Sequence, residues 1–561
     1  MKFSQMKYQR PELSQVQSNV QMLLSKFKAA TTAQDAMDCY IAYDEYLNKE
    51  VAQFSSLSYI RYSIDTNDQF YKDEVDFWDE TWPVLEEDTK AFTSALLASP
   101  FRKDLEAAWG PVMFINAEIE LKTFKPEIVE DLQVENALCT EHDDLKASAQ
   151  IPFEGEMKTL AQMGAYHENP DPNVRRSARD AVAGWYQENG DKLDEIFDKM
   201  VKVRTKIAKT LGYDNFVELG YYRMGRNCYG AEDVAKFRQG LAEHIVPLVS
   251  RFKAEQAKRI GVDKITLYDN FFSYPDGNPQ PKGTPDDIMA HGRKMYKEMS
   301  PDTADFIDVL MDNELFDVLA RTGKQGGGYC SYLPAYGMPF IFANFDGTAG
   351  DVDVLTHEVG HALAGYEARN TKPSGLVDTP QDISEIHSMA MEFFAWPWME
   401  GFFGDQTEKY YDSHLSGSVT FFPYGAMVDE FQHWIYENHT ASSADRHAHW
   451  AKMEQKYRPY LDQSEVPFYQ DGRWWQNQLH IYVVPFYYID YVLAGVVALS
   501  FWAENQRDPK AAWDKYMKLL RTAGTKTFLD LIKEAGVPTP FEPANIKSVA
   551  DAVTAWLDNR K

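Results

Sequence analysis

The segment that decides the fold is DVDVLTHEVGHALAG, which spans residues 351–365. Its apolar residues recur at the spacing of one helix face, at positions 352, 355, 359 and 363. On such a helix, His357 and His361 are about 40° apart around the axis, so both imidazoles project from one face. Two imidazoles placed in this way can bind one Zn²⁺, with Glu358 beside the ion rather than on it.

A second segment with helical character supplies the carboxylate that such a site needs. It covers residues 382–392, and Glu385 in it lies 24 residues after His361. Glu385 would complete a site of two histidines and one glutamate and leave the fourth position for water. Glu392 is two turns further along the same face, where it can accept the outer N–H of a zinc-bound imidazole. His387 points about 200° away from Glu385 and is expected to be structural.

The segment HIYVVPFYYIDYVLAG, residues 480–495, is rich in hydrogen-bond donors. Tyr487 and Tyr491 share one face of a helix that we expect to begin at Pro485, with His480 on the turn before it. A stripe of tyrosines is usually core packing. A phenol aimed at a zinc-bound carbonyl has another use, because it can stabilise a tetrahedral oxyanion. Both interpretations stay open at this point.

Most of the remaining chain is predicted to be helical. Long helices are expected over residues 157–260, with interruptions near residues 169–172 and at Gly190-Asp191. Residues 326–346 are the expected exception. There, aromatic and β-branched residues follow three glycines and favour two short strands.

Composition and charge narrow the classes of partner. The chain has 57 basic and 85 acidic residues, a net charge of −28, which disfavours binding to a phosphate backbone. Four cysteines are too few for a disulfide framework, and the N-terminus has no apolar signal-like run. The most apolar window, residues 481–503, contains Asp490, Pro485 and four tyrosines, so we expect a buried helix rather than a membrane span. These features predict a cytoplasmic location, with neither nucleic acid nor a membrane as partner.

Taken together, these motifs resemble the thimet oligopeptidase and oligoendopeptidase F family of zinc metallopeptidases, in particular the shorter bacterial oligoendopeptidase F and Pz-peptidase branch. The resemblance covers about residues 326–502, and the first 160 residues match only in helical character and length. The motifs that carry it, in chain order, are Gly326-Gly-Gly-Tyr-Cys330, the strand Phe340–Phe345, Gly347-Thr348, His357–His361, Glu385 with Ser388 and Glu392, residues 422–433, and residues 480–495.

The resemblance implies a mainly α-helical fold. It has two helical lobes around a deep substrate channel, with a small β-sheet next to the active-site helix. It divides the chain into an N-terminal helical lobe, residues 1–160, and a catalytic domain, residues 161–561. It also implies one Zn²⁺ per chain, bound by His357, His361 and Glu385.

The remaining site residues are likewise implied by the resemblance. Glu358 would be the general base, with Glu392 supporting a metal ligand. The residues near the scissile carbonyl would be His480 and Tyr491, with Tyr487 and Tyr488 as further candidates. Phe342, Ala343 and Asn344 would bind substrate if their strand is an edge that pairs with a peptide backbone; the other interpretation is plain core sheet.

The predicted activity is hydrolysis of internal bonds in short peptides by a monomer or small homo-oligomer. The nearest alternative is a zinc peptidyl-dipeptidase that releases C-terminal dipeptides. A helical interaction scaffold with a chance motif is a second alternative, and it would hold no stoichiometric zinc. A glycosidase built on Asp429 and Glu430 is a third, but adjacent helical residues point about 100° apart and are poorly placed for it.

Overall fold

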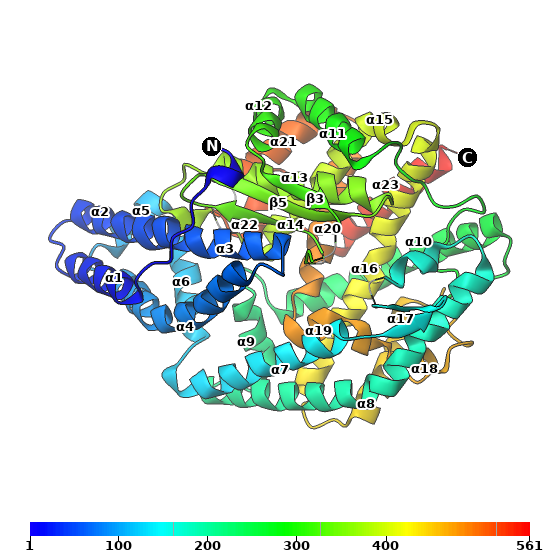
Figure 1. The fold of residues 1–561 in the computed structure, drawn as a ribbon, viewed down its shortest axis with the longest axis horizontal. Coiled ribbons are helices and arrows are strands. Elements are labelled where there is room, and N and C mark those ends of the chain that lie inside the picture. Colours follow the sequence, from blue (N-terminus) through cyan, green and yellow to red (C-terminus); the bar gives the residue numbers. More distant parts are fainter. Residues whose placement is uncertain (161, 322, 326, 378, 523, 561) are drawn as a thin grey trace. The chain divides into compact units, whose positions relative to one another are not determined.

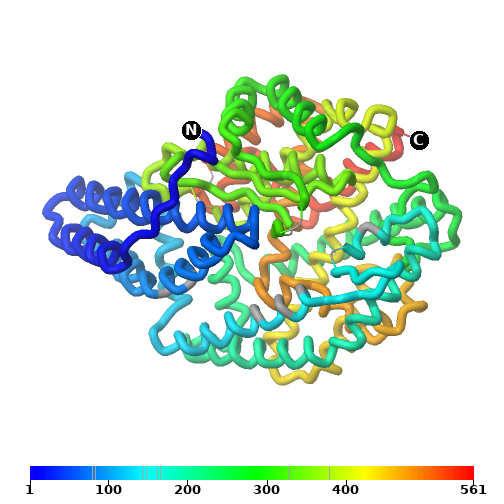
Figure 2. Tube along the Cα trace, in the orientation of Figure 1, coloured from blue at the N-terminus to red at the C-terminus, as the bar shows by residue number. Residues whose placement is uncertain are grey.

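The computed structural model describes residues 1–561 except 161, 322, 326, 378, 523 and 561. Gly326, the first residue of the motif Gly326-Gly-Gly-Tyr-Cys330, therefore lies outside the described residues. The chain divides into two units, each built from three stretches of sequence. Unit 1 contains residues 1–121, 280–407 and 497–538, and unit 2 contains residues 122–279, 408–496 and 539–561. Figure 2 traces the chain by residue number through these stretches.

The predicted division at about residue 160 follows chain order, whereas the units do not. Residues 122–160 belong to unit 2, and residues 280–407 return to unit 1. The predicted lobe 1–160 therefore does not coincide with either unit. Helical periodicity shows where helices form, but it does not show which distant helices pack together.

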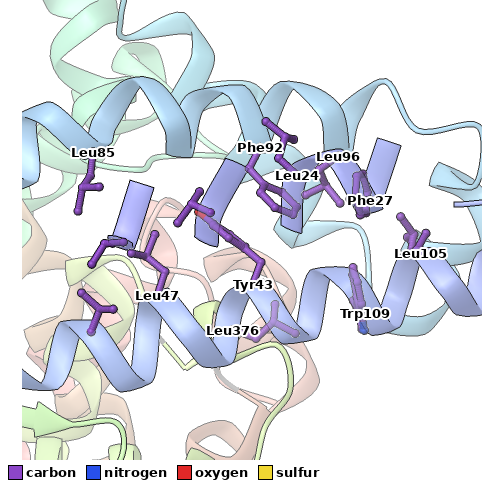
Figure 3. Packing of buried hydrophobic residues seen from close by; sticks show 14 of the residues in the cluster. Leu24, Phe27, Tyr43, Leu47, Leu85, Phe92, Leu96, Leu105, Trp109 and Leu376 are labelled. Atoms are coloured by element: carbon purple, nitrogen blue, oxygen red, sulfur yellow. The ribbon is translucent and has the colours of Figure 1, made fainter. Parts of the chain in front are cut away.

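Unit 1 begins with a layer of helices around one apolar core (Figure 3). Tyr43 and Phe92 stack at its centre, with ring centroids 3.9 Å apart and planes at 18°. Leu376, far along the sequence, closes the same cluster. The helices of this layer are α1 (Leu13–Lys28), α2 (Ala33–Asp44), α3 (Ala52–Ile64), α4 (Gln69–Leu97), α5 (Arg102–Trp109) and α6 (Val112–Lys122).

The rest of unit 1 is a three-stranded sheet with its covering helices (Figure 1). The strands are β3 (Phe316–Leu319), β4 (Tyr329–Leu333) and β5 (Met338–Phe345), and α13 packs against both β4 and β5. The helices are α11 (Pro285–Met299), α12 (Pro301–Asp312), α13 (Gly350–Ala368), α14 (Gln381–Phe394), α15 (Met399–Phe403), α21 (Pro509–Thr522) and α22 (Phe528–Glu534).

The sheet order corrects one prediction. It is β3-β5-β4, so the strand expected to be a substrate-pairing edge is the central one. Phe342 pairs with Asp317 of β3 on one side and with Tyr329 of β4 on the other. Phe342 and Ala343 are also buried. The Phe342 backbone is paired on both sides and the Ala343 oxygen accepts from Lys324, so the core interpretation is the right one, and β4 is an outer strand.

Unit 2 is built on long helices and one small hairpin, β1 (Ile151–Phe153) with β2 (Glu156–Lys158). The helix α8 starts at Pro172, as the expected interruption requires, but it continues unbroken through Gly190 and Asp191 to Leu211. A Cβ atom at residue 190 would lie 2.6 Å from Arg473 Nη2, so this position inside the helix is crowded by that side chain. The other helices are α7 (Val129–Ala147), α9 (Phe216–Arg223), α10 (Ala231–Ile260), α16 (Thr407–Glu437), α17 (Ser443–Tyr457), α18 (Pro467–Gln470), α19 (Leu479–Val483) and α23 (Pro543–Asp558). The helix α20 (Tyr488–Asn505) begins in unit 2, and its residues from Val497 onward belong to unit 1.

The apolar window at residues 481–503 is divided between two helices, and only α20 is long. Its residues Ile489, Val492 and Leu493 are fully buried. Within the described part of the chain, no helix combines the length and hydropathy needed to cross a bilayer.

Candidate metal centre and active site

Three side chains from two helices converge in unit 1. His357 and His361 project from α13, and Glu385 projects from α14. The Glu385 Oε2 atom lies 3.3 Å from His357 Nε2 and 3.5 Å from His361 Nε2. The three ligand atoms all lie within 4.8 Å of one another, and they form the one potential metal-binding group found among the described residues.

The separations between the Glu385 oxygen and the two imidazole nitrogens fit Zn²⁺. Two donors at about 2.0–2.1 Å from a tetrahedral ion lie roughly 3.3–3.4 Å apart. The two nitrogen–oxygen separations, 3.3 and 3.5 Å, are close to that value. Two imidazole nitrogens and one carboxylate oxygen are also donors that zinc prefers, and three protein ligands leave one tetrahedral position open.

Outer hydrogen bonds hold the ligands in the orientation that metal binding needs. His357 Nδ1 lies 2.7 Å from Glu392 Oε1, and this contact leaves Nε2 for the ion. The Ser384 hydroxyl is 3.3 Å from His361 Nδ1. The Ser388 hydroxyl donates to Glu385 Oε2 at 2.9 Å. Glu392 thus occupies the supporting place expected for it, while Ser384 was not identified from the sequence.

Gly360, the fourth residue of the HEVGH segment, lets the two ligand-bearing helices come together. A Cβ atom at residue 360 would lie 2.4 Å from the backbone oxygen of His387 and 2.7 Å from Ser388 Cα. Both are backbone atoms of α14, so they cannot swing away as a side chain could. The close approach of α13 and α14 therefore depends on the absence of a side chain at residue 360.

We expect Gly360→Ala to separate α13 from α14. Overpacking of this kind typically costs about 1–3 kcal/mol of folding free energy, and here it also moves Glu385 away from the two imidazoles. Urea unfolding and zinc titration should both show the loss. Gly184→Ala in α8 is a matched control, because nothing lies within 4 Å of its added Cβ. Metal affinity and stability equal to those of the unsubstituted protein would show that the helices do not need this contact.

Glu358 lies on α13 between the two imidazoles in sequence but outside the group of metal donors. Its side chain is buried, and burial raises the pKa of Glu358 above its ordinary value, against the lowering effect of the two histidines. The Oε2 atom has no hydrogen-bond partner among the described residues. A buried carboxylate in this state can accept a proton more readily than an exposed one.

The glycine-rich segment that precedes β4 passes beside the Glu358 carboxylate. A Cβ on Gly328 would lie 3.8 Å from Glu358 Oε1. Asn344, predicted to bind substrate, instead donates its side-chain amide to the backbone oxygens of Gln325 and Gly327, at 2.9 and 2.8 Å. Asn344 therefore stabilises the backbone of the glycine-rich segment before β4.

The second group of predicted residues gathers in unit 2. His480 lies in the short helix α19 rather than on a turn, and its ring centroid is 4.6 Å from that of Tyr488. The Tyr487 hydroxyl donates to the Tyr491 hydroxyl at 2.8 Å. Burial, together with the nearby Lys146, lowers the pKa of His480 to about 4, so this imidazole is neutral at pH 7. The structure thus brings His480, Tyr487, Tyr488 and Tyr491 together.

A strained residue separates His480 from the tyrosines. The helix α20 begins at Tyr488 and not at the predicted Pro485, because Phe486 has a φ of 71°, in the left-handed region that bulky residues rarely adopt. The Gln432 side chain accepts from the Phe486 N–H at 2.8 Å, and Arg226 donates to the Phe486 carbonyl. Arg226 is paired with Asp490 at 2.7 Å, so buried polar groups over-determine this bend.

Each set of predicted residues is therefore assembled within its own unit. The metal donors and Glu358 belong to unit 1, and His480 with the tyrosines belongs to unit 2. The contact of His480 and Tyr491 with a carbonyl held at the metal stays a prediction. The carboxylates considered for a glycosidase are engaged elsewhere, because Asp429 pairs with Arg238 and Glu430 binds Lys456.

Comparison with known proteins identifies the family. The model of the peptidase M3 N-terminal domain matches residues 3–124, and that of peptidase family M3 matches residues 165–286 and 298–550. Together they match well over half of the chain, which belongs to peptidase family M3.

Relatives and solved structures agree with this assignment. Oligopeptidase PepF of Bacillus subtilis (strain 168) is 23% identical over 393 residues, which are 67% of this chain and 56% of the relative. The chromosomal oligoendopeptidase F of Lactococcus lactis subsp. cremoris is 23% identical over 398 residues, 68% of this chain and 62% of the relative. The matched region thus spans about three fifths of these curated relatives. A solved structure described as PZ peptidase A with inhibitor 2 has 45% identity and a TM-score of 0.94, and the match covers 100% of this chain and 99% of that one.

Proposed function

We propose that this chain is a zinc-dependent oligoendopeptidase that hydrolyses internal bonds of short peptides. The observation that carries the proposal is the convergence of three donor atoms, with the Glu385 oxygen at zinc spacing from both imidazoles, together with the buried Glu358, which is not one of the three. Membership of peptidase family M3 and the printed names of the relatives support the substrate class.

His357, His361 and Glu385 would hold one ion per chain. A bound Zn²⁺ would lower the pKa of a coordinated water to about 7 and polarise the substrate carbonyl. Glu358 accepts the proton of the attacking water, because burial raises its pKa and so makes the carboxylate a better proton acceptor than an exposed one. It then passes that proton to the leaving amine.

His480 and Tyr491 would stabilise the oxyanion. Tyr491 accepts from Tyr487, so the Tyr491 hydroxyl proton is not used in this bond. Neutral His480 can donate from one ring nitrogen. Donors of this kind act on the charge that develops in the transition state and not on the ground-state carbonyl.

A peptide with both ends blocked tests the proposal directly. We expect cleavage at internal bonds of an acetylated and amidated peptide of about ten residues, loss of cleavage after treatment with a chelator, and recovery when Zn²⁺ is returned. Mass spectrometry would place the cut. Release of dipeptides from free C-termini alone would instead assign a peptidyl-dipeptidase. No cleavage of any peptide, with no stoichiometric zinc, would favour a helical scaffold.

A further inference from the structure

Gln478, two residues before His480, contacts the imidazole of His480 through its side-chain amide. Its side-chain Nε2 lies 2.7 Å from His480 Nδ1. Its Oε1 accepts from the Tyr424 hydroxyl at 2.9 Å. Gln478 is 9% exposed, and the helix α16 supplies Tyr424. A three-residue chain of hydrogen bonds therefore ends on one ring nitrogen of His480.

The chemistry of the amide determines which nitrogen of His480 carries the proton. The bond from Tyr424 to Oε1 orients the amide with Nε2 toward His480, and an amide nitrogen donates, so in this arrangement Nδ1 accepts and carries no hydrogen. In a neutral imidazole the proton is then on Nε2. Burial and Lys146 keep the ring neutral at pH 7. Nε2–H is consequently the form that can donate outward.

We propose that Gln478, held by Tyr424, is a positioning residue that fixes His480 as the Nε2–H tautomer and thereby presents a proton to the carbonyl oxygen under attack. This inference rests on the proposed role of His480 in peptide hydrolysis. Gln478 itself touches neither substrate nor metal. Gln478 acts by determining which ring nitrogen of His480 donates.

The surroundings of His480 contain few charges that could compete with this contact. Lys146 of α7 acts on the ring electrostatically, and it donates to the Asn477 backbone oxygen at 2.8 Å. The other titratable groups that face the ring are Tyr487, Tyr488 and Tyr491. Arg458, directly after α17, lies 5.0 Å from the centroid of the Tyr424 ring and is paired with Glu454. A carboxylate introduced at residue 478 would therefore be the nearest negative charge.

Gln478→Glu reverses the hydrogen bond with almost no change of shape. The introduced carboxylate accepts from Nδ1–H, which raises the pKa of His480. Below that pKa the imidazolium still donates from Nε2. Above it, the remaining proton is held on Nδ1 by the carboxylate, and Nε2 becomes an acceptor. Donation to the oxyanion is then lost as the pH rises through the new pKa.

The test is the pH profile of kcat for a blocked peptide with zinc-loaded enzyme. For Gln478→Glu we expect a new descending limb on the alkaline side, beyond which kcat falls by about 10²-fold with little change in KM. A merely structural role would lower activity at all pH values or change stability, without adding a limb. Gln187→Glu, which adds the same charge at an exposed position of α8, should keep the original profile. A Gln478→Glu profile without the new limb would overturn the proposal.

A second measurement does not need activity. Ring ¹⁵N shifts of the unsubstituted protein, with the His480 signals assigned by their loss in His480→Asn, should show Nε2 protonated and Nδ1 not. Protonated Nδ1 would overturn the proposal even if Gln478→Glu fails to fold. Failure of the proposed function is distinguishable, because the unsubstituted enzyme would then leave the blocked peptide intact while the tautomer could still be determined.

Discussion

Replacing Glu358 by Gln is expected to remove nearly all turnover while leaving the metal in place. The amide has the shape of the carboxylate but cannot accept the proton of the attacking water. General acid–base catalysis contributes about 10²–10⁴-fold, so kcat should fall by that factor. Zinc content should not change, because the ligand atoms belong to His357, His361 and Glu385. Steady-state kinetics and elemental analysis of one preparation give both quantities.

Two comparisons make this result specific. Glu367→Gln lies on the same helix and removes an ion pair with Arg521 at 2.7 Å, so it controls for loss of one negative charge on α13. Its activity should stay close to that of the unsubstituted enzyme. Glu385→Ala should lose metal together with activity. A Glu358→Gln enzyme with normal kcat would end the general-base assignment, whatever its zinc content.

The convergence of the three candidate metal donors could be predicted because most of their geometry is local. The four-residue separation of His357 and His361 fixes their common face on any α-helix. Glu385 is less local, but it lies in the next α-helix along the chain, and the structure brings it within 3.5 Å of both imidazoles. The approach itself depends on Gly360, whose role appears only when the backbone of α14 is seen beside it.

What escaped prediction depends on contacts between distant residues. Whether β5 is an edge strand or core sheet stayed open from the sequence, because its second partner β3 has only four residues and no clear alternation. The left-handed Phe486 was hidden for a different reason. Its backbone is held by Gln432 and Arg226, which are far away in sequence, so the tyrosine helix starts three residues later than Pro485 indicates.

The hydrogen bond between Tyr487 and Tyr491 suggests a different role for each of them, which the sequence alone did not distinguish. Tyr487 donates to Tyr491, so Tyr491 is the one expected to direct its proton to the oxyanion, and Tyr487 orients it. We expect Tyr491→Phe to lower kcat by about 10²–10³-fold, with a much smaller change in KM, because the bond forms fully only in the transition state. Tyr487→Phe should cost less, because the Tyr491 hydroxyl would remain.

Rate measurements on three variants decide this assignment. Tyr268→Phe is a suitable control, because its hydroxyl binds Asp180 in the same unit at 2.9 Å and has no place in the proposed site. If Tyr491→Phe keeps kcat while Tyr487→Phe loses it, the donor is Tyr487 and the direction of their hydrogen bond reverses during catalysis. If neither loses activity, the tyrosine stripe is core packing. The oxyanion would then depend on His480, whose substitution should cause the larger loss.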